Sequence, residues 1–293
     1  MAMRSWLFVP GDSEKKLSKV AGTGADVVIV DLEDAVAPHA KPQARRFAHD
    51  WLQAHRTQVL AKPQGHWIRI NGLDTQLWRE DLAAVMPAGP KGVVVPKATG
   101  PEQLRALSAE IYELEQRNGL PHHSTGIMPL VGETPASAFS LPAYAENPQP
   151  RLAGLTWGAE DLSAAIGASR KRDADGEWTD TFRLVRAQVL LAAHACNVMA
   201  VDTLHADFRD EDGLRRIAQA SRADGFHGML AIHPAQVPII NEAFTPSEAE
   251  LAEARAIVEA FTANPAAGAL SLDGRMVDQP HLAQAKRRLG MVG

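Results

Sequence analysis

Eight short runs rich in Val, Ile and Leu recur along this chain of 293 residues, and segments with a helical pattern separate most of them. Continuous aliphatic runs of this kind are typical of parallel strands that are buried on both faces. Repeated β/α units of this number predict a closed TIM (β/α)8 barrel rather than an open sheet. The predicted strands are residues 5–9, 25–30, 67–71, 92–95, 126–132, 152–158, 198–202 and 228–232.

The chain is longer than a barrel needs, since a single α/β barrel occupies ~250 residues. We expect residues 1–243 to form the barrel and residues 244–293 to form a C-terminal helical extension. Within the extension, Ser247 begins an acidic helix, and a basic helix that contains residues 286–288 ends the tail.

The composition excludes several classes of function. A net charge of −5 argues against nucleic acid or an anionic membrane as the main partner. The single cysteine, Cys196, excludes a disulfide framework and suits a reducing compartment. The first apolar run is too short for a signal peptide, and no run approaches the ~20 residues that span a bilayer. We therefore expect a soluble cytoplasmic protein.

Two consecutive predicted strands lead into carboxylates. Residues 126–132 stop at Glu133, and residues 152–158 are followed by Glu160 and Asp161. The carboxyl ends of neighbouring parallel strands meet at one edge, so Glu133 and Asp161 should lie close together and attract a hard cation such as Mg²⁺. Taken singly, Glu133 could be an acid at a helix N-terminus and Asp161 an N-cap. The pair on consecutive strands favours the metal site.

The alternation of residues in the third strand places an arginine at the same end of the barrel, which we call its mouth. Ile68 and Ile70 share one face, which suits the helix layer, so Arg69 takes the other face together with Asn71. A buried cation needs a partner, because an unpaired one costs several kcal/mol. The second predicted strand leads into Asp31 and Glu33, which are suitable partners.

Other polar groups near the strand ends carry a weaker signal. Asp202 ends the seventh strand, and Lys97 follows the fourth, where a solvated loop lysine and a functional one are equally compatible with the sequence. His233, before Pro234, fits a structural role or a contact at the edge of the substrate. Lys15 and Lys19 fit either a solvated helix face or a phosphate contact.

These motifs together resemble the citrate lyase β-subunit-like family of CoA-ester lyases, which includes malyl-CoA and citramalyl-CoA lyases. The resemblance covers nearly the whole chain. The matching segments are residues 4–11 (RSWLFVPG), 31–36 (DLEDAV), 68–71 (IRIN), 132–134 (GET), 158–162 (GAEDL), 232–237 (IHPAQV) and 274–278 (GRMVD).

The resemblance implies a TIM barrel with Mg²⁺ on Glu133 and Asp161. It implies reversible cleavage of a 3-hydroxyacyl-CoA into an acyl-CoA and a 2-oxo acid, in which Arg69 stabilises the thioester enolate. It also implies a C-terminal lid in which Asp278 delivers a proton to the acyl carbon.

The supporting contacts follow from the same resemblance. Asp31 and Glu33 would hold metal-bound water or Arg69. The coenzyme A contacts would come from Lys15, Lys19, His233 and Pro234. Because the lid of family members covers a neighbouring subunit's site, we expect a homotrimer or a dimer of trimers.

Two departures from the family leave the substrate open. Pro135-Ala136-Ser137 replaces a common Ala-Arg-Gly, and residues 170–173 are unusually charged. Two alternatives remain: a 2-oxo-acid aldolase that acts without CoA, and a citrate lyase β-like subunit that acts on a carrier-bound acyl group.

Overall fold

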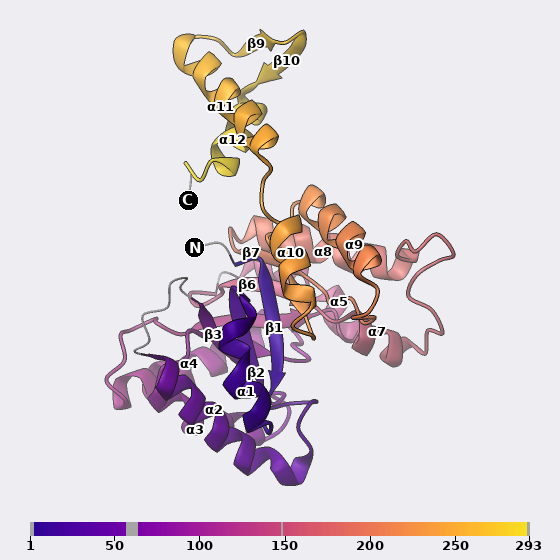
Figure 1. Cartoon of the computed structure of the whole chain (residues 1–293). Helices are drawn as coiled ribbons and strands as arrows, with labels where there is room; N and C mark the ends of the chain where they lie inside the picture. Colours follow the sequence, from indigo (N-terminus) through magenta and orange to yellow (C-terminus); the bar gives the residue numbers. More distant parts are fainter. Residues whose placement is uncertain (1–2, 57–63, 148, 292–293) are drawn as a thin grey trace. The chain divides into compact units, whose positions relative to one another are not determined.

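The computed structural model describes residues 3–56, 64–147 and 149–291. The chain divides into two compact units, Met1–Phe244 and Thr245–Gly293 (Figure 1). The first unit contains the predicted strands, and the second contains the C-terminal tail.

The first unit is built around a closed barrel in which each strand pairs in parallel with the next one in the sequence and β8 pairs with β1. This confirms the predicted TIM barrel. The ends of the strands agree with those of the predicted runs to within two residues. They are β1 (Ser5–Pro10), β2 (Val27–Asp31), β3 (Gly65–Arg69), β4 (Gly92–Val95), β5 (Gly126–Val131), β6 (Gly154–Trp157), β7 (Met199–Asp202) and β8 (Gly228–Ala231).

Helices connect the strands and cover the outside of the barrel (Figure 1). Short 3-10 turns follow or precede some of them, at Ala21–Thr23, Pro38–Ala40 and Met86–Ala88. Among the described residues, no helix has the length and apolar character needed to cross a membrane. The helices are α1 (Glu14–Val20), α2 (Lys41–Arg56), α3 (Leu77–Val85), α4 (Pro101–Arg117), α5 (Pro135–Phe139), α6 (Pro142–Glu146), α7 (Ala159–Ile166), α8 (Asp180–Ala195), α9 (Glu211–Asp224) and α10 (Gln236–Ala243).

Alternation along the strands separates two cores. Val27 and Ile29 of β2 pack inside the barrel, whereas Val28 and Val30 belong to the larger core between strands and helices. Because successive side chains of a strand point to opposite faces, Asp31 follows Ile29 on the inward face and emerges at the mouth.

Buried polar pairs hold the helix layer in place. Arg151, before β6, donates two hydrogen bonds to Glu115 of α4 at 2.8 and 2.7 Å, and the two side chains are 1% and 0% exposed. Both charges are thus compensated by a bidentate contact, which burial requires.

The sequence predicted a helical C-terminal extension, but this unit also contains two strands. Its helices α11 (Glu248–Ala263) and α12 (Gln279–Arg288) flank an antiparallel hairpin of β9 (Ala269–Leu272) and β10 (Arg275–Asp278). The turn residues Asp273 and Gly274 both have positive φ, 50° and 76°. An Asp-Gly pair between two short alternating runs is a strong hairpin signal, and it was the signal available in the sequence.

Candidate active site

The predicted arginine lies at the barrel mouth in a bidentate pair. Arg69, the last residue of β3, donates to Asp31 through Nε at 2.7 Å and Nη2 at 2.6 Å. Its guanidinium also lies 4.9 Å from the ring centroid of Phe8. Burial alone would lower the pKa of Arg69, but the hydrogen bonds and charge of Asp31 raise it, so this cation stays charged. An arginine has five N–H donors, so donors remain for a ligand.

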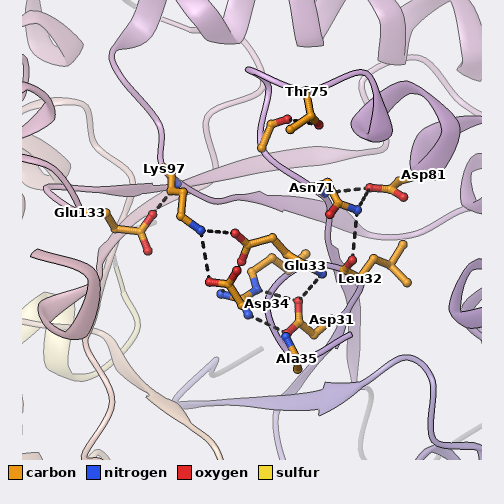
Figure 2. A network of polar contacts seen from close by, with 12 residues as sticks. Asp31, Leu32, Glu33, Asp34, Ala35, Asn71, Thr75, Asp81, Lys97 and Glu133 are labelled. Carbon is orange, nitrogen blue, oxygen red and sulfur yellow. Dashed lines mark hydrogen bonds and ion pairs between the residues drawn. The ribbon is translucent and has the colours of Figure 1, made fainter. Parts of the chain in front are cut away.

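Glu33 lies between two cations. Its Oε2 is 3.2 Å from Arg69 Nη1, and its Oε1 accepts a hydrogen bond from Lys97 Nζ (Figure 2). The segment that carries it is fixed from below, because the buried Lys41 donates to the main-chain oxygens of Leu32 and Glu33 at 2.8 and 3.0 Å. Burial raises the pKa of Glu33 despite the opposing effects of Arg69 and Lys97. No pattern in the sequence predicted these contacts of Lys41.

Glu133 follows β5 and is 2% exposed. Its Oε2 accepts a hydrogen bond from the main-chain N–H of Lys97 (Figure 2). Burial, followed by the negative charge of Asp161, raises the pKa of Glu133 to about 8. Asp161, predicted from the next strand end, is therefore close enough to oppose the ionisation of Glu133.

The local backbone is shaped around the Glu133 side chain. Gly158, the N-cap of α7, lies so close that an added Cβ would be 2.6 Å from Glu133 Oε1. Asp161 lies in the first turn of α7 and is half-buried, so it is not the N-cap that the alternative interpretation required. A side chain at position 158 would displace the Glu133 carboxylate from its place beside Asp161.

This pair of acids fits a divalent cation. Two opposed carboxylates, one of them almost fully buried, are stabilised in their charged forms by a bound cation. In the described part of the chain, no group of three or more His, Cys, Asp or Glu side chains is placed to hold a metal. Mg²⁺ commonly binds through one or two carboxylates and completes its shell with water and substrate oxygens, so the pair matches that ion.

Two polar residues predicted at the mouth turn into the helix layer instead. Asn71 lies beyond the end of β3, where its side chain donates to Asp81 of α3 at 2.7 Å and to Leu32 O at 3.0 Å. Asp202 accepts hydrogen bonds from Trp157 at 2.7 Å and from Arg186 of α8 at 2.8 Å. Strand alternation does not extend past the last ladder residue, which explains Asn71. Asp202 follows the inward Val201 and therefore faces outward.

A pocket of about 420 Å³ opens beside the N-terminal strand, and all four residues predicted to contact coenzyme A line it. Lys15 and Lys19 line it from α1, and His233 and Pro234 line it from the loop after β8. Lys16 lines the same pocket, so three lysines approach one apolar cavity.

The loop after β8 is fixed by its own contacts. Gln236 Oε1 accepts hydrogen bonds from the main-chain N–H groups of Ile232 and His233 at 2.9 and 3.1 Å. The His233 ring stacks on Phe208 with centroids 4.6 Å apart. His233 is thereby held at the edge of the lysine-lined pocket.

Asp278 lies in the C-terminal unit at the start of α12. Its Oδ1 is 2.5 Å from His281 Nδ1, and its pKa is lowered mainly by this hydrogen bond. Asp278 and His281 form a capping box at the start of α12.

The two departures from the family pattern have local explanations. Ser137 completes a capping box with Thr134, in which each side chain bonds the other residue's main-chain N–H, at 3.1 and 3.2 Å. In the charged loop, Lys171 pairs with Glu160, and the guanidinium of Arg172 lies 3.6 Å from the ring centroid of Trp178.

Comparison with known proteins agrees with this geometry. The family model of the HpcH/HpaI aldolase/citrate lyase family matches residues 4–234. The chain belongs to the HpcH/HpaI aldolase/citrate lyase family. The predicted resemblance is confirmed, and the protein is a lyase.

Several relatives match over almost the whole chain. A citrate lyase subunit beta-like protein of Mycobacterium tuberculosis is 36% identical over 98% of this chain and 95% of its own length. The (3S)-malyl-CoA thioesterase of Cereibacter sphaeroides is 32% identical over 98% and 93%. The mitochondrial citramalyl-CoA lyase of Mus musculus is 32% identical over 97% and 84%.

Several similar crystal structures contain ligands. CitE of Mycobacterium tuberculosis, in complex with magnesium, acetoacetate and coenzyme A, has a TM-score of 0.78 and 36% identity and covers 99% of this chain and 97% of its own.

Proposed function

We propose that this protein is a Mg²⁺-dependent carbon–carbon lyase that reversibly cleaves a 3-hydroxyacyl-CoA of the malyl-CoA or citramalyl-CoA type into an acyl-CoA and a 2-oxo acid. The observation that carries the proposal is the buried Glu133, opposed by Asp161 in a mouth that also presents Arg69. The family membership and the CitE complex with magnesium and coenzyme A support it.

In this proposal Glu133 and Asp161 hold the metal. Bound Mg²⁺ supplies a Lewis acid that polarises the carbonyl of the 2-oxo acid and offsets the charge of the two carboxylates. Lys97 orients Glu133 through its main-chain N–H. Because Glu133 is almost fully buried, its carboxylate has little freedom to move away from that position.

Arg69 binds the other half of the substrate. Cleavage of the C–C bond leaves negative charge on the thioester oxygen, and a fixed cation at that point stabilises the transition state. Asp31 holds Arg69 by two hydrogen bonds, and Glu33 lies beside the third guanidinium nitrogen. The guanidinium is thus oriented before the substrate binds, and the two acids act through it.

The lysine-lined pocket is the proposed coenzyme A site. Lys15 and Lys19 supply cations suited to phosphate groups, and the cavity behind them is largely apolar. His233 and Pro234 also line this pocket. The proton for the acyl carbon would come from Asp278, which remains a prediction from the family resemblance, as does a trimeric assembly.

A second reaction is favoured by one relative. The (3S)-malyl-CoA thioesterase of Cereibacter sphaeroides is as similar to this chain as the citramalyl-CoA lyase is. Its name describes hydrolysis of the thioester. In that reaction water cleaves the thioester bond, and no enolate forms because the C–C bond stays intact. The products separate the two: cleavage of the C–C bond yields a 2-oxo acid and an acyl-CoA, whereas hydrolysis yields free CoA and a hydroxy acid.

The test is a product assay with (3S)-malyl-CoA, (3S)-citramalyl-CoA and the free hydroxy acids, each with Mg²⁺ and with a chelator. We expect a 2-oxo acid from a CoA ester and no product from the free acids. Chelation should remove activity, and added Mg²⁺ should restore it. Free CoA thiol without a 2-oxo acid would favour the thioesterase, and cleavage of a free acid would favour an aldolase. Turnover only of a carrier-bound acyl group would identify a citrate lyase β-like subunit.

A further inference from the structure

Lys97 occupies an unusual place at the mouth. It follows β4, whose partners in the barrel are β3 and β5, and it contacts acids carried by both the β2 and the β5 loops. Its side chain is 38% exposed, yet it is directed at carboxylates rather than at water alone. Figure 2 shows Lys97 between Glu133 on one side and Glu33 with Asp34 on the other.

The main chain of Lys97 orients Glu133. Its φ is 50°, a left-handed conformation that residues other than glycine rarely adopt. The Lys97 N–H donates to Glu133 Oε2, and the next N–H, of Ala98, donates to Leu130 O of β5 at 3.2 Å. Two consecutive amides therefore fasten this loop to the end of β5, and their hydrogen bonds offset the cost of the left-handed conformation.

The side chain of Lys97 holds Glu33 in place. Its ammonium group donates to Glu33 Oε1 and, at 3.2 Å, to Asp34 Oδ2. The other oxygen of Glu33 is buried, makes no hydrogen bond within the described residues and lies 3.2 Å from Arg69 Nη1. Without the ammonium group, Glu33 would depend on Arg69 alone and would compete with Asp31 for that guanidinium.

We propose that Lys97 is a positioning residue that sets both halves of the active site: its main-chain N–H orients Glu133, and its ammonium group holds Glu33 so that Arg69 stays paired with Asp31. The inference rests on the proposed function for its effect on turnover. Its structural part, the coupling of Lys97 to Glu33, stands without that function. Lys97 acts through Arg69 and Glu133 and is not assigned a contact with the substrate.

The test separates the side chain from the main chain. Lys97→Met removes the ammonium group and keeps the N–H that bonds Glu133. We expect kcat to fall by about 10- to 100-fold, because a small displacement of Arg69 is enough for such a loss. The same variant should bind Mg²⁺ alone at least as tightly as the wild type, because Glu133 keeps its hydrogen bond and one nearby positive charge is gone. A general collapse of the mouth would weaken Mg²⁺ binding as well.

The matched control is Lys91→Met. Lys91 lies just before the other end of the same strand and is exposed, so this variant should leave kcat and the melting temperature unchanged. If Lys97→Met does not fold, Lys97→Gln keeps a donor for Glu33 and tests the loss of charge alone.

A double-mutant cycle with Glu33→Gln tests the mechanism without any substrate. We expect Lys97→Met to lower the melting temperature by about 3 °C or more, and the Lys97→Met/Glu33→Gln double variant to regain part of that loss. Fully additive losses would show that Lys97 does not act through Glu33 and would overturn the proposal. Wild-type kcat in Lys97→Met, in an enzyme shown to be a lyase, would also overturn it. If the wild type proves not to be a lyase, the cycle and the Mg²⁺ titration still decide the role of Lys97.

Discussion

Removing the charge of Glu133 should change how the stability of the metal-free barrel depends on pH. In the folded protein the pKa of Glu133 is about 8, whereas its ordinary value is 4.5. Between these values the folded state keeps a proton that the unfolded state has lost. The free energy of unfolding of the wild type should therefore fall as the pH rises through this window. Glu133→Gln has almost the same shape, can still accept the hydrogen bond from Lys97, and does not titrate.

The size of the effect follows from the shift. One pKa unit corresponds to about 1.4 kcal/mol, so the wild type should lose up to about 1.4 kcal/mol per pH unit relative to Glu133→Gln. From about pH 5.5 to about pH 7.5 the relative loss approaches about 3 kcal/mol. For a barrel of this size, that is a fall in melting temperature of roughly 5 to 10 °C relative to the variant.

Tryptophan fluorescence is a suitable assay, because all six tryptophans lie in the first unit and report its unfolding alone. Both proteins are unfolded in chelator at several pH values, and the difference between them is plotted against pH. Other titrating groups cancel in this difference. Saturating Mg²⁺ should abolish the relative slope, since a bound cation keeps Glu133 ionised.

Parallel pH profiles in chelator would refute the reasoning, because they would mean that Glu133 ionises as an ordinary exposed acid does. A slope that Mg²⁺ leaves unchanged would instead contradict the metal assignment while leaving the pKa intact.

Three further outcomes are expected. Arg69→Lys keeps the charge but loses the planar fork that binds Asp31, so turnover should fall by ~10²-fold or more while Mg²⁺ binding persists; wild-type turnover would reduce Arg69 to a structural ion-pair partner. Asp278→Asn should retain Mg²⁺ and 2-oxo-acid binding but lose exchange of the acyl α-protons with solvent, and mixing it with Arg69→Lys should restore part of the activity if subunits share a site. No recovery despite proven subunit exchange would contradict a shared site. Arg151→Met should destabilise the barrel by about 3 to 5 kcal/mol in urea unfolding, because it leaves Glu115 buried without its cation, with only neutral donors such as the main-chain N–H groups of His123 and Thr125. A loss below about 1 kcal/mol would show that these neutral donors are enough to stabilise the Glu115 carboxylate.

The sequence by itself determined the barrel and much of the mouth. Strand alternation has a period of two, so the aliphatic residues around Arg69 were enough to place it on the inward face. The same rule placed Asp31 there, and the order of parallel strands brought Glu133 close to Asp161. These inferences depend on local periodicity and on neighbouring strands meeting at one edge, both of which can be read from the chain.

Only the tertiary structure decided what happens where the strands end. The ladder of β3 stops at Arg69, so Asn71 is free to turn toward Asp81. The sequence left Lys97 undecided, because its left-handed backbone and its contacts with two separate loops arise from packing rather than from any residue pattern. Periodicity assigns a face only while the backbone stays regular. Beyond the last ladder residue, the loop dihedral angles and the partners brought by distant elements decide where a side chain points.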